Sequence, residues 1–298
     1  MRGVVIGIVL AGTLGISVLL HSYVQDTGSR SQSSSGFISL SPGLTETLFA
    51  LGAGDAVKGV TQFCLYPPEA QERVSVGGLL DPNYEALVAL NPQLIFMTPY
   101  HRDLRREMRR LGLSYEIVPQ DTLPEIRESF LHVGVLCGHE EEGRKLVAAL
   151  DRHMSAVSEL VRDREKMRVL LVTGRNEHSG SLQEVYAVST GSFLSDLLEI
   201  AGAENCVAGA VAEYPALSVE GILHLDPEYI IELVEKDPQT ALPKLMAPWQ
   251  ALSELQAVQN SRVKILGGSH FTIPGPRITQ VLDAFVAALH PDLKECVL

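Results

Sequence analysis

The chain has 298 residues, of which 46% are hydrophobic and 20% are charged, which is typical of a globular protein and excludes a largely disordered one. A chain of this length has room for two domains of ordinary size. The formal net charge of −12 argues against a nucleic-acid-binding protein, because neutralising phosphates requires clustered lysine and arginine side chains.

An uncharged, mostly apolar run over residues 4–20 follows Arg2 near the N-terminus. This layout is typical of an export signal, and the run is also near the minimum length that spans a bilayer. The Ser- and Gly-rich stretch over residues 27–36 would serve as a flexible linker in either case. We therefore expect residues 1–36 to be a signal peptide or membrane anchor plus a linker. Both alternatives place the globular part in the periplasm or another extracytoplasmic space.

Strands and helices are expected to alternate through most of the remaining chain. We predict strands over 37–40, 57–63, 94–97 and 114–118, and helices over 45–51, 84–90 and 101–111. Further strands are predicted over 169–173, 185–188, 229–233 and 263–266. From 139 to 166 apolar residues recur at helical spacing without a proline, which predicts one long helix.

This pattern predicts an α/β fold with two lobes joined by one long α-helix. Strands that alternate with helices indicate parallel sheets covered on both faces. We expect an N-terminal lobe over 37–138, a connecting helix over 139–166 and a C-terminal lobe over 167–298. A single helix between the lobes allows little hinge motion.

The chain contains two pairs of similar segments, and the members of both pairs occur in the same order in its two halves. Residues 85–95 and 220–230 both read Glu, four residues, Leu, Asn or Asp, and Pro before an apolar run. Residues 45–53 and 195–203 form a second pair. The repeats indicate two copies of one domain, and proteins with two similar lobes often bind ligands in the cleft between them.

The loops at the carboxyl ends of the predicted strands are the expected ligand site, because α/β domains bind their ligands there. They hold aromatic, arginine and histidine side chains, and the candidates are Phe63, Tyr66, Tyr100, His101, Arg175, Tyr214, His270, Phe271 and Arg277. We expect the tyrosines and Phe271 to supply apolar faces. Arg175 and Arg277 would meet ligand carboxylates. The set suits a large, flat or anionic ligand.

Other interpretations of these loops stay open. His101, His178 and His270 each follow a different predicted strand, so they would either converge on a metal or line a wet cleft. Trp249 would close one rim of the cleft or pack within its own lobe. The cysteines would form the pairs Cys64–Cys137 and Cys206–Cys296, or remain thiols.

Signatures of enzymes are weak in this sequence. It has no phosphate loop, no G-x-S-x-G elbow and no dinucleotide fingerprint. We therefore expect a binding protein that performs no catalysis and carries no cofactor.

The repeated glutamates, Glu85 and Glu220, need an explanation of their own. Each begins a predicted short helix, where a carboxylate is stabilised by the helix dipole. Helix capping explains an acidic residue at either place. A pair of equivalent carboxylates, one per lobe, would alternatively dock on basic sites of a two-fold symmetric partner.

An ordered series of short motifs resembles a known family over residues 37–291. It includes Leu40-Ser41-Pro42, Thr45-Glu46, Tyr66-Pro67-Pro68, Val76-Gly77-Gly78, Leu90-Asn91-Pro92, Ser218-Val219-Glu220 and Gly275-Pro276-Arg277. The series resembles the solute-binding proteins of bacterial ABC importers for iron–siderophore, haem and cobalamin. The resemblance implies two Rossmann-like lobes bridged by one helix, with the ligand held between them.

The resemblance also implies a function and partners. A monomeric receptor would capture a metal chelate, an iron–siderophore or cobalamin, and deliver it to an ABC permease dimer. Glu85 and Glu220 would sit on the lobe tips and pair with permease arginines. Cobalamin binders of this family usually offer several cleft tryptophans, where this chain has Leu44, Leu79, Thr98 and Tyr214. The alternatives are a haem or free-metal receptor with histidine ligands, and a chelatase-like enzyme on a similar scaffold.

Overall fold

The computed structural model describes residues 36–176, 181–210, 212–236, 238–239 and 241–297. The leader expected over residues 1–36 therefore lies, except for Gly36, outside the described residues. Across these described ranges no helix has the length and apolar character needed to span a membrane.

The N-terminal lobe is built on a parallel sheet of five strands in the order β3-β2-β1-β4-β5. The strands are β1 (Phe37–Ser39), β2 (Val57–Val60), β3 (Val74–Ser75), β4 (Leu94–Met97) and β5 (Tyr115–Ile117). Helix α2 (Pro42–Ala50) packs on one face with Leu44 and Leu48, against Phe37 and Phe96. Helices α3 (Tyr84–Leu90) and α4 (Leu104–Arg110) cover the other face. Apolar side chains on both faces fit a parallel sheet that is buried on both sides.

The C-terminal lobe has a mixed sheet of six strands. The strands are β6 (Met167–Gly174), β7 (Val185–Ala187), β8 (Ala203–Asn205), β9 (Ala216–Leu217), β10 (Tyr229–Val234) and β11 (Val263–Gly267). Strand β10 lies between β6 and β11, and β8 also pairs with β6; all these pairs are parallel. Strand β7 runs antiparallel to β6 and to β9, which corrects the prediction of a wholly parallel sheet. The chain between β6 and β7 is shorter than the dozen or so residues that a parallel crossover requires.

Helices cover both faces of this second sheet as well. Helices α7 (Phe193–Ile200) and α11 (Ile278–Leu289) contribute to the core on one face. Helices α8 (Val219–Leu225), α9 (Leu242–Gln250) and α10 (Gln256–Gln259) lie on the other. Trp249 of α9 is fully buried there, so it packs within its own lobe and does not close a rim of the cleft. The short helix α12 (Lys294–Val297) ends the described chain.

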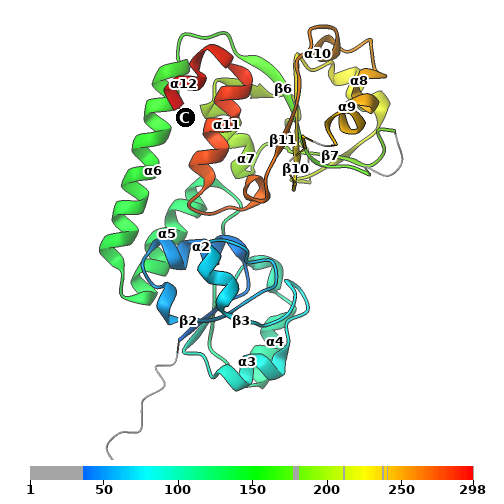
Figure 1. The fold of residues 1–298 in the computed structure, drawn as a ribbon. Helices are drawn as coiled ribbons and strands as arrows, with labels where there is room; N and C mark the ends of the chain where they lie inside the picture. The colour runs from blue at the N-terminus through cyan, green and yellow to red at the C-terminus, as the bar shows by residue number, and fades with distance from the viewer. Residues whose placement is uncertain (1–35, 177–180, 211, 237, 240, 298) are drawn as a thin grey trace, which may run out of the picture.

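The lobes are joined by a helical hairpin rather than by an isolated helix. Helix α6 (Glu140–Val161) is the predicted long helix, and it runs along one side of the molecule from one lobe to the other (Figure 1). Helix α5 (Leu123–Cys137), which the sequence reading missed, packs against α6. Gly138, in the left-handed conformation at φ 74°, ends α5 and lets the chain reverse. The lobe boundaries placed at 139 and 166 stay a prediction.

Candidate ligand-binding cleft

Loops from the carboxyl ends of strands in both lobes meet at one cavity of about 190 Å³. Its N-lobe lining is Pro42, Phe63, Leu65 and Tyr66, and its C-lobe lining is Glu235, Ser269, Thr272, Ile273 and Arg277. A larger cavity of about 530 Å³ lies beside α2, and Tyr66 and Arg277 line it too. We place the ligand cleft at the smaller cavity, because α/β domains bind ligands at the carboxyl ends of their strands.

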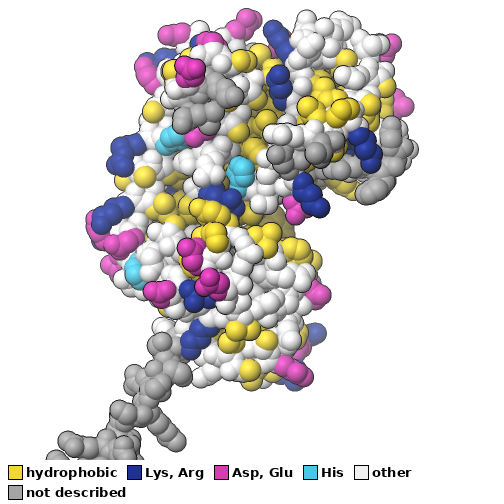
Figure 2. All heavy atoms as spheres, viewed as in Figure 1, with side chains coloured by type: hydrophobic (Ala, Val, Ile, Leu, Met, Phe, Trp, Pro, Cys, Tyr) yellow, Lys and Arg dark blue, Asp and Glu magenta, His cyan; other side chains and the backbone are white. Residues whose placement is uncertain are grey.

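Large apolar side chains are left exposed at this meeting of the lobes. Phe63 and Leu65 are each 51% exposed, and Tyr66 is 44% exposed. Tyr100, in the turn after β4, is 59% exposed, and Tyr214 of the C-terminal lobe is 36% exposed. Figure 2 shows hydrophobic side chains gathered where the two lobes meet. Clustered exposed apolar residues of this kind mark a surface that binds something.

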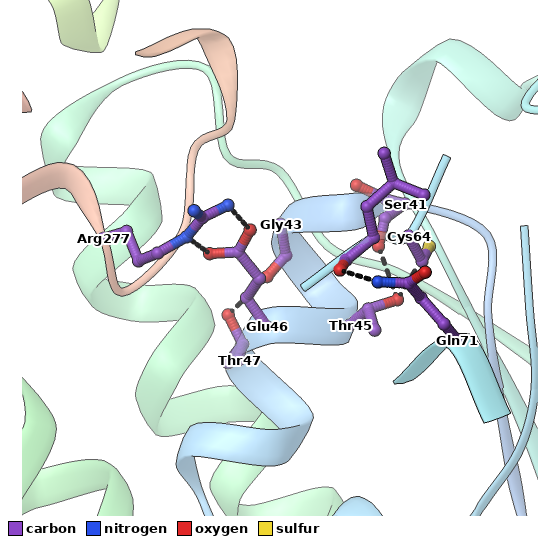
Figure 3. A network of polar contacts seen from close by, with 9 residues as sticks. Ser41, Gly43, Thr45, Glu46, Thr47, Cys64, Gln71 and Arg277 are labelled. Atoms are coloured by element: carbon purple, nitrogen blue, oxygen red, sulfur yellow. Dashed lines mark hydrogen bonds and ion pairs between the residues drawn. The ribbon is translucent and has the colours of Figure 1, made fainter. Parts of the chain in front are cut away.

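An ion pair joins the lobes beside Tyr66. The guanidinium of Arg277 donates two hydrogen bonds to the carboxylate of Glu46 on α2, at 2.9 Å from Nε and 2.5 Å from Nη2. Figure 3 shows Arg277 reaching from its C-lobe loop to Glu46 on the helix. The same guanidinium lies 4.1 Å from the centroid of the Tyr66 ring. Burial raises the pKa of the Glu46 carboxyl, and the pairing with Arg277 only partly offsets this.

A second polar cluster spans the lobes near Tyr100. The hydroxyl of Tyr100 interacts with Asp121 of the N-terminal lobe and with Glu213 of the C-terminal lobe, and Glu213 also interacts with Tyr214. Burial is the main reason that the pKa of each carboxyl is raised, and the repulsion between the two carboxylates adds to the effect at Glu213. The structure thus brings the predicted residues Tyr100 and Tyr214 together.

Three of the predicted residues are buried, which corrects their expected place on the cleft surface. Arg175 has a side chain that is 1% exposed, because it pairs with Glu232 at 2.7 Å inside the C-terminal lobe. Phe271 is 4% exposed and belongs to the core of that lobe. His101 is 1% exposed, and its Nδ1 accepts a hydrogen bond from the backbone N–H of Thr98.

The other histidines do not complete a metal site in the part of the chain that is described. His270 is half-buried and stacks on Phe271 with ring centroids 4.4 Å apart. His178 lies outside the described residues. Among the described residues there is no group of three or more His, Cys, Asp or Glu side chains placed to hold a metal ion. All four cysteines are free thiols, of which Cys64 is buried between Thr45 and Thr61.

The helices that carry the repeated glutamates are built alike. Glu85 on α3 and Glu220 on α8 occupy the second position of helices of seven residues each. The N-cap side chains are Asn83 and Ser218, and each accepts a hydrogen bond from the third residue of its helix. Both helices end at a left-handed residue before a proline. Both glutamates are exposed and lie in the first turn of their helices, where the helix dipole stabilises a carboxylate, so this structural role stays open beside a docking role.

Three residues with cross-lobe contacts were not predicted from the sequence. Glu46 and Asp121 lie in the N-terminal lobe and Glu213 lies in the C-terminal lobe, and each interacts with a residue of the other lobe or shares a partner with one. Arg277, the partner of Glu46, is separated from it by 231 positions. Glu46 belongs to the Thr45-Glu46 motif of the sequence analysis. That motif drew attention to the residue but did not indicate that Arg277 is its partner.

The sequence profile of the periplasmic binding proteins matches residues 38–269. A cobalamin-binding protein of Halobacterium salinarum is 27% identical over 260 residues, which cover 85% of this chain and 69% of that protein. A substrate-binding lipoprotein of an ABC transporter of Bacillus subtilis is 25% identical and covers 86% of this chain and 80% of its own length.

The solved structures include close matches to this fold. The periplasmic vitamin B12 binding protein of Vibrio cholerae superposes with a TM-score of 0.73 at 25% identity, over 87% of this chain and 98% of that structure. A match over 87% of this chain is longer than either lobe, so it includes parts of both lobes. With its profile match over most of its length and this architecture, the chain belongs to the periplasmic binding protein family.

Proposed function

We propose that this protein is the extracytoplasmic substrate-binding component of an ABC importer, and that its ligand is a corrinoid of the cobalamin type. The observation that carries the proposal is the set of exposed aromatic rings where the lobes meet, with Phe63, Tyr66 and Tyr100 from the N-terminal lobe and Tyr214 from the C-terminal lobe. Flat faces on both sides of a cleft suit a large macrocycle with an extensive apolar surface. The family, and relatives named for cobalamin and for an ABC transporter, support the same conclusion.

The charges of the cleft favour a corrinoid over a ferric siderophore. Arg175 and Arg277 were the side chains expected to meet ligand carboxylates. Both are committed within the protein, Arg175 to Glu232 and Arg277 to Glu46. A polyanionic chelate would need to break one of these pairs, which is costly for buried charges. A macrocycle recognised through its faces needs neither arginine.

The size of the cleft bears on how such a ligand is held. A cavity of about 190 Å³ is smaller than the roughly 300–1,000 Å³ typical of small-molecule pockets. A corrinoid would therefore be held at the mouth of the cleft between the exposed tyrosines, because separating the lobes would break the buried pair of Arg277 and Glu46.

Absorption titration with cyanocobalamin tests the ligand, with haemin and a ferric catecholate siderophore, which is polyanionic, as the competing probes. We expect cyanocobalamin to bind and to raise the melting temperature. Tyr66→Ala should weaken binding at least about tenfold, whereas Tyr66→Phe, which keeps the ring, should stay within about threefold of wild type. Tight binding of haemin or of the siderophore, without binding of cyanocobalamin, would overturn the corrinoid assignment.

The delivery step is proposed to use the two repeated glutamates. Glu85 and Glu220 are exposed, lie at equivalent positions of equivalent helices and occur once per lobe, as docking to a two-fold symmetric permease requires. The double variant Glu85→Ala with Glu220→Ala should bind ligand normally but fail to support uptake. The matched control is Glu72→Ala with Glu254→Ala, which removes one exposed glutamate from each lobe elsewhere. Uptake by the first variant at the level of this control would refute the docking role.

A further inference from the structure

Arg277 connects the two lobes through contacts on two sides of its guanidinium. It is held by the Glu46 carboxylate through two hydrogen bonds, and it lies over the Tyr66 ring at 4.1 Å from the centroid. The side chains of Glu46 and Arg277 are 2% and 13% exposed. Charges this deeply buried persist only as a pair, because either one alone would be left without compensation. The contact is therefore a fixed part of this arrangement of the lobes.

The backbone at this contact is packed as closely as the side chains. A Cβ atom added at Gly43 of α2 would lie 2.4 Å from the carbonyl oxygen of Pro274 in the C-terminal lobe. A Cβ atom at Gly275 would lie 3.4 Å from Gly43. Only glycine at position 43 allows the loop before Arg277 to approach α2 so closely. The separation of the lobes at this point is thus set at backbone distance.

The same contact determines how Tyr66 can meet a ligand. An aromatic ring has two faces, and Arg277 covers one face of Tyr66. Tyr66 and Arg277 line both the cleft and the larger cavity beside α2, so this stacked pair is a wall between the two spaces. A ligand can stack only on the face of Tyr66 that Arg277 leaves free.

We propose that Glu46 and Arg277 are positioning residues of the ligand cleft, which fix the separation of the lobes and the orientation of the Tyr66 ring. Neither residue needs to contact the ligand for this role. Glu46 holds Arg277, and Arg277 supports Tyr66. The ligand-binding part of this inference rests on the proposed function, whereas the connection between the lobes does not.

The connection is tested first without any ligand. The variants are Glu46→Gln, which removes the charge but keeps the shape, and Arg277→Lys, which keeps the charge but loses the two-pronged, stacked geometry. The matched control is Asp151→Asn, because Asp151 also accepts two hydrogen bonds from an arginine, Arg127, but within the α5–α6 hairpin. Circular dichroism establishes that each variant is folded. Small-angle X-ray scattering and amide hydrogen exchange then report the lobe separation and the local opening.

We expect both inter-lobe variants to show a larger radius of gyration than the wild type and faster exchange over residues 268–277 by about tenfold. The control should match the wild type in both measurements. Unchanged scattering and exchange in Glu46→Gln and Arg277→Lys would overturn the proposal. If Glu46→Gln does not fold, Arg277→Lys decides the question alone, because it leaves no buried carboxylate without a cation.

Cyanocobalamin titration then tests the support of Tyr66. Glu46→Gln should weaken binding about three- to tenfold, mainly through faster dissociation, because the ring must be ordered on binding. In a Tyr66→Ala background the same substitution should change the affinity by less than about twofold, since the supported ring is gone. An undiminished effect in that background would contradict positioning through Tyr66. If the wild type does not bind cyanocobalamin at all, the corrinoid assignment fails, while the ligand-free measurements still decide the connection.

Discussion

Arg175 shows how burial assigns a role to a single residue. Its guanidinium donates to Glu232 and to the carbonyl oxygen of Leu245. Trp249 donates its indole N–H to the other oxygen of the same carboxylate at 2.6 Å. The charge expected at the cleft surface is instead part of a buried network that ties β10 to α9. Networks of this kind are costly to break on one side only.

Replacing Arg175 should therefore affect stability before it affects ligand binding. Arg175→Gln leaves the carboxylate of Glu232 buried without its cation, and we expect the free energy of unfolding to fall by about 3–5 kcal/mol. Arg127→Gln removes an equally well-formed but half-exposed pair and should cost at most about 1 kcal/mol. Denaturant unfolding measures both. Equal stability of the two variants, with ligand binding lost only in Arg175→Gln, would instead make Arg175 a ligand contact.

His101 gives the protein a defined pH dependence. Burial is the main cause that lowers its pKa below the usual value of 6.5. As the pH falls below 6.5, the unfolded chain takes up the proton before the folded one does, so stability is lost. Burial is also the main cause that lowers the pKa values of His270 and His290. His101→Asn, which can keep an acceptor for the Thr98 N–H, should reduce the drop in melting temperature between pH 7.5 and 5.5. His224→Asn, on an exposed position of α8, should leave that drop unchanged.

Elements that are specified locally were predicted well, and those that depend on tertiary context were not. The predicted helix over 84–90 and strand over 94–97 coincide with α3 and β4, because Asn83 caps the helix and Asn91-Pro92 ends it. Helix α5 begins with a capping box between Thr122 and Glu125, a local signal that was available in the sequence. The direction of β7, by contrast, is set by its pairing with β6.

The same division applies to the candidate site. Tyr66 and Tyr100 could be predicted because they follow β2 and β4, and strand ends gather at one edge of a sheet. The contacts that charged residues make with these tyrosines could not be predicted from the sequence. Asp121 and Glu213 come from different lobes, and the pairing of Glu46 with Arg277 crosses most of the chain. Such contacts depend on the relative placement of the lobes, which local patterns do not encode.

Replacing a glycine by alanine should have opposite effects on stability in helices α6 and α8. A Cβ atom at Gly143 would lie 2.7 Å from the carbonyl oxygen of Phe130 on α5. Gly143→Ala should therefore push the two helices apart and cost about 1–3 kcal/mol, more than the helix gains from alanine. A Cβ atom at Gly221 would meet only Ser218 Oγ at 3.5 Å, an ordinary contact. Gly221→Ala should thus stabilise the protein by about 0.5 kcal/mol. Denaturant unfolding compares the pair, and equal effects would show that the α5–α6 contact is not tight.

At the scale of the whole molecule, the α5–α6 hairpin belongs to the cores of both lobes. Phe130 of α5 and Leu150 of α6 lie in a core cluster of the C-terminal lobe, whereas Val133, one turn further along α5, lies in a cluster of the N-terminal lobe. Leu146 of α6 packs against both clusters. Together with the contact between Arg277 and Glu46, this makes the lobes mechanically dependent on each other, and it limits their relative motion to small changes in the cleft.

Because the α5–α6 hairpin belongs to the cores of both lobes, we expect the two lobes to unfold together. Calorimetry should show a single transition whose calorimetric and van't Hoff enthalpies agree, since neither lobe can lose its side of the hairpin without exposing the core of the other. Leu146→Ala should lower the stability of the whole by about 2 kcal/mol and keep a single transition, because the side chain supports both clusters. Val263→Ala, confined to the core of the second sheet, is the control for a substitution within one lobe. If Leu146→Ala instead splits the transition into two and shifts only one of them, the hairpin belongs to one lobe, and the other is attached to it as an independent domain.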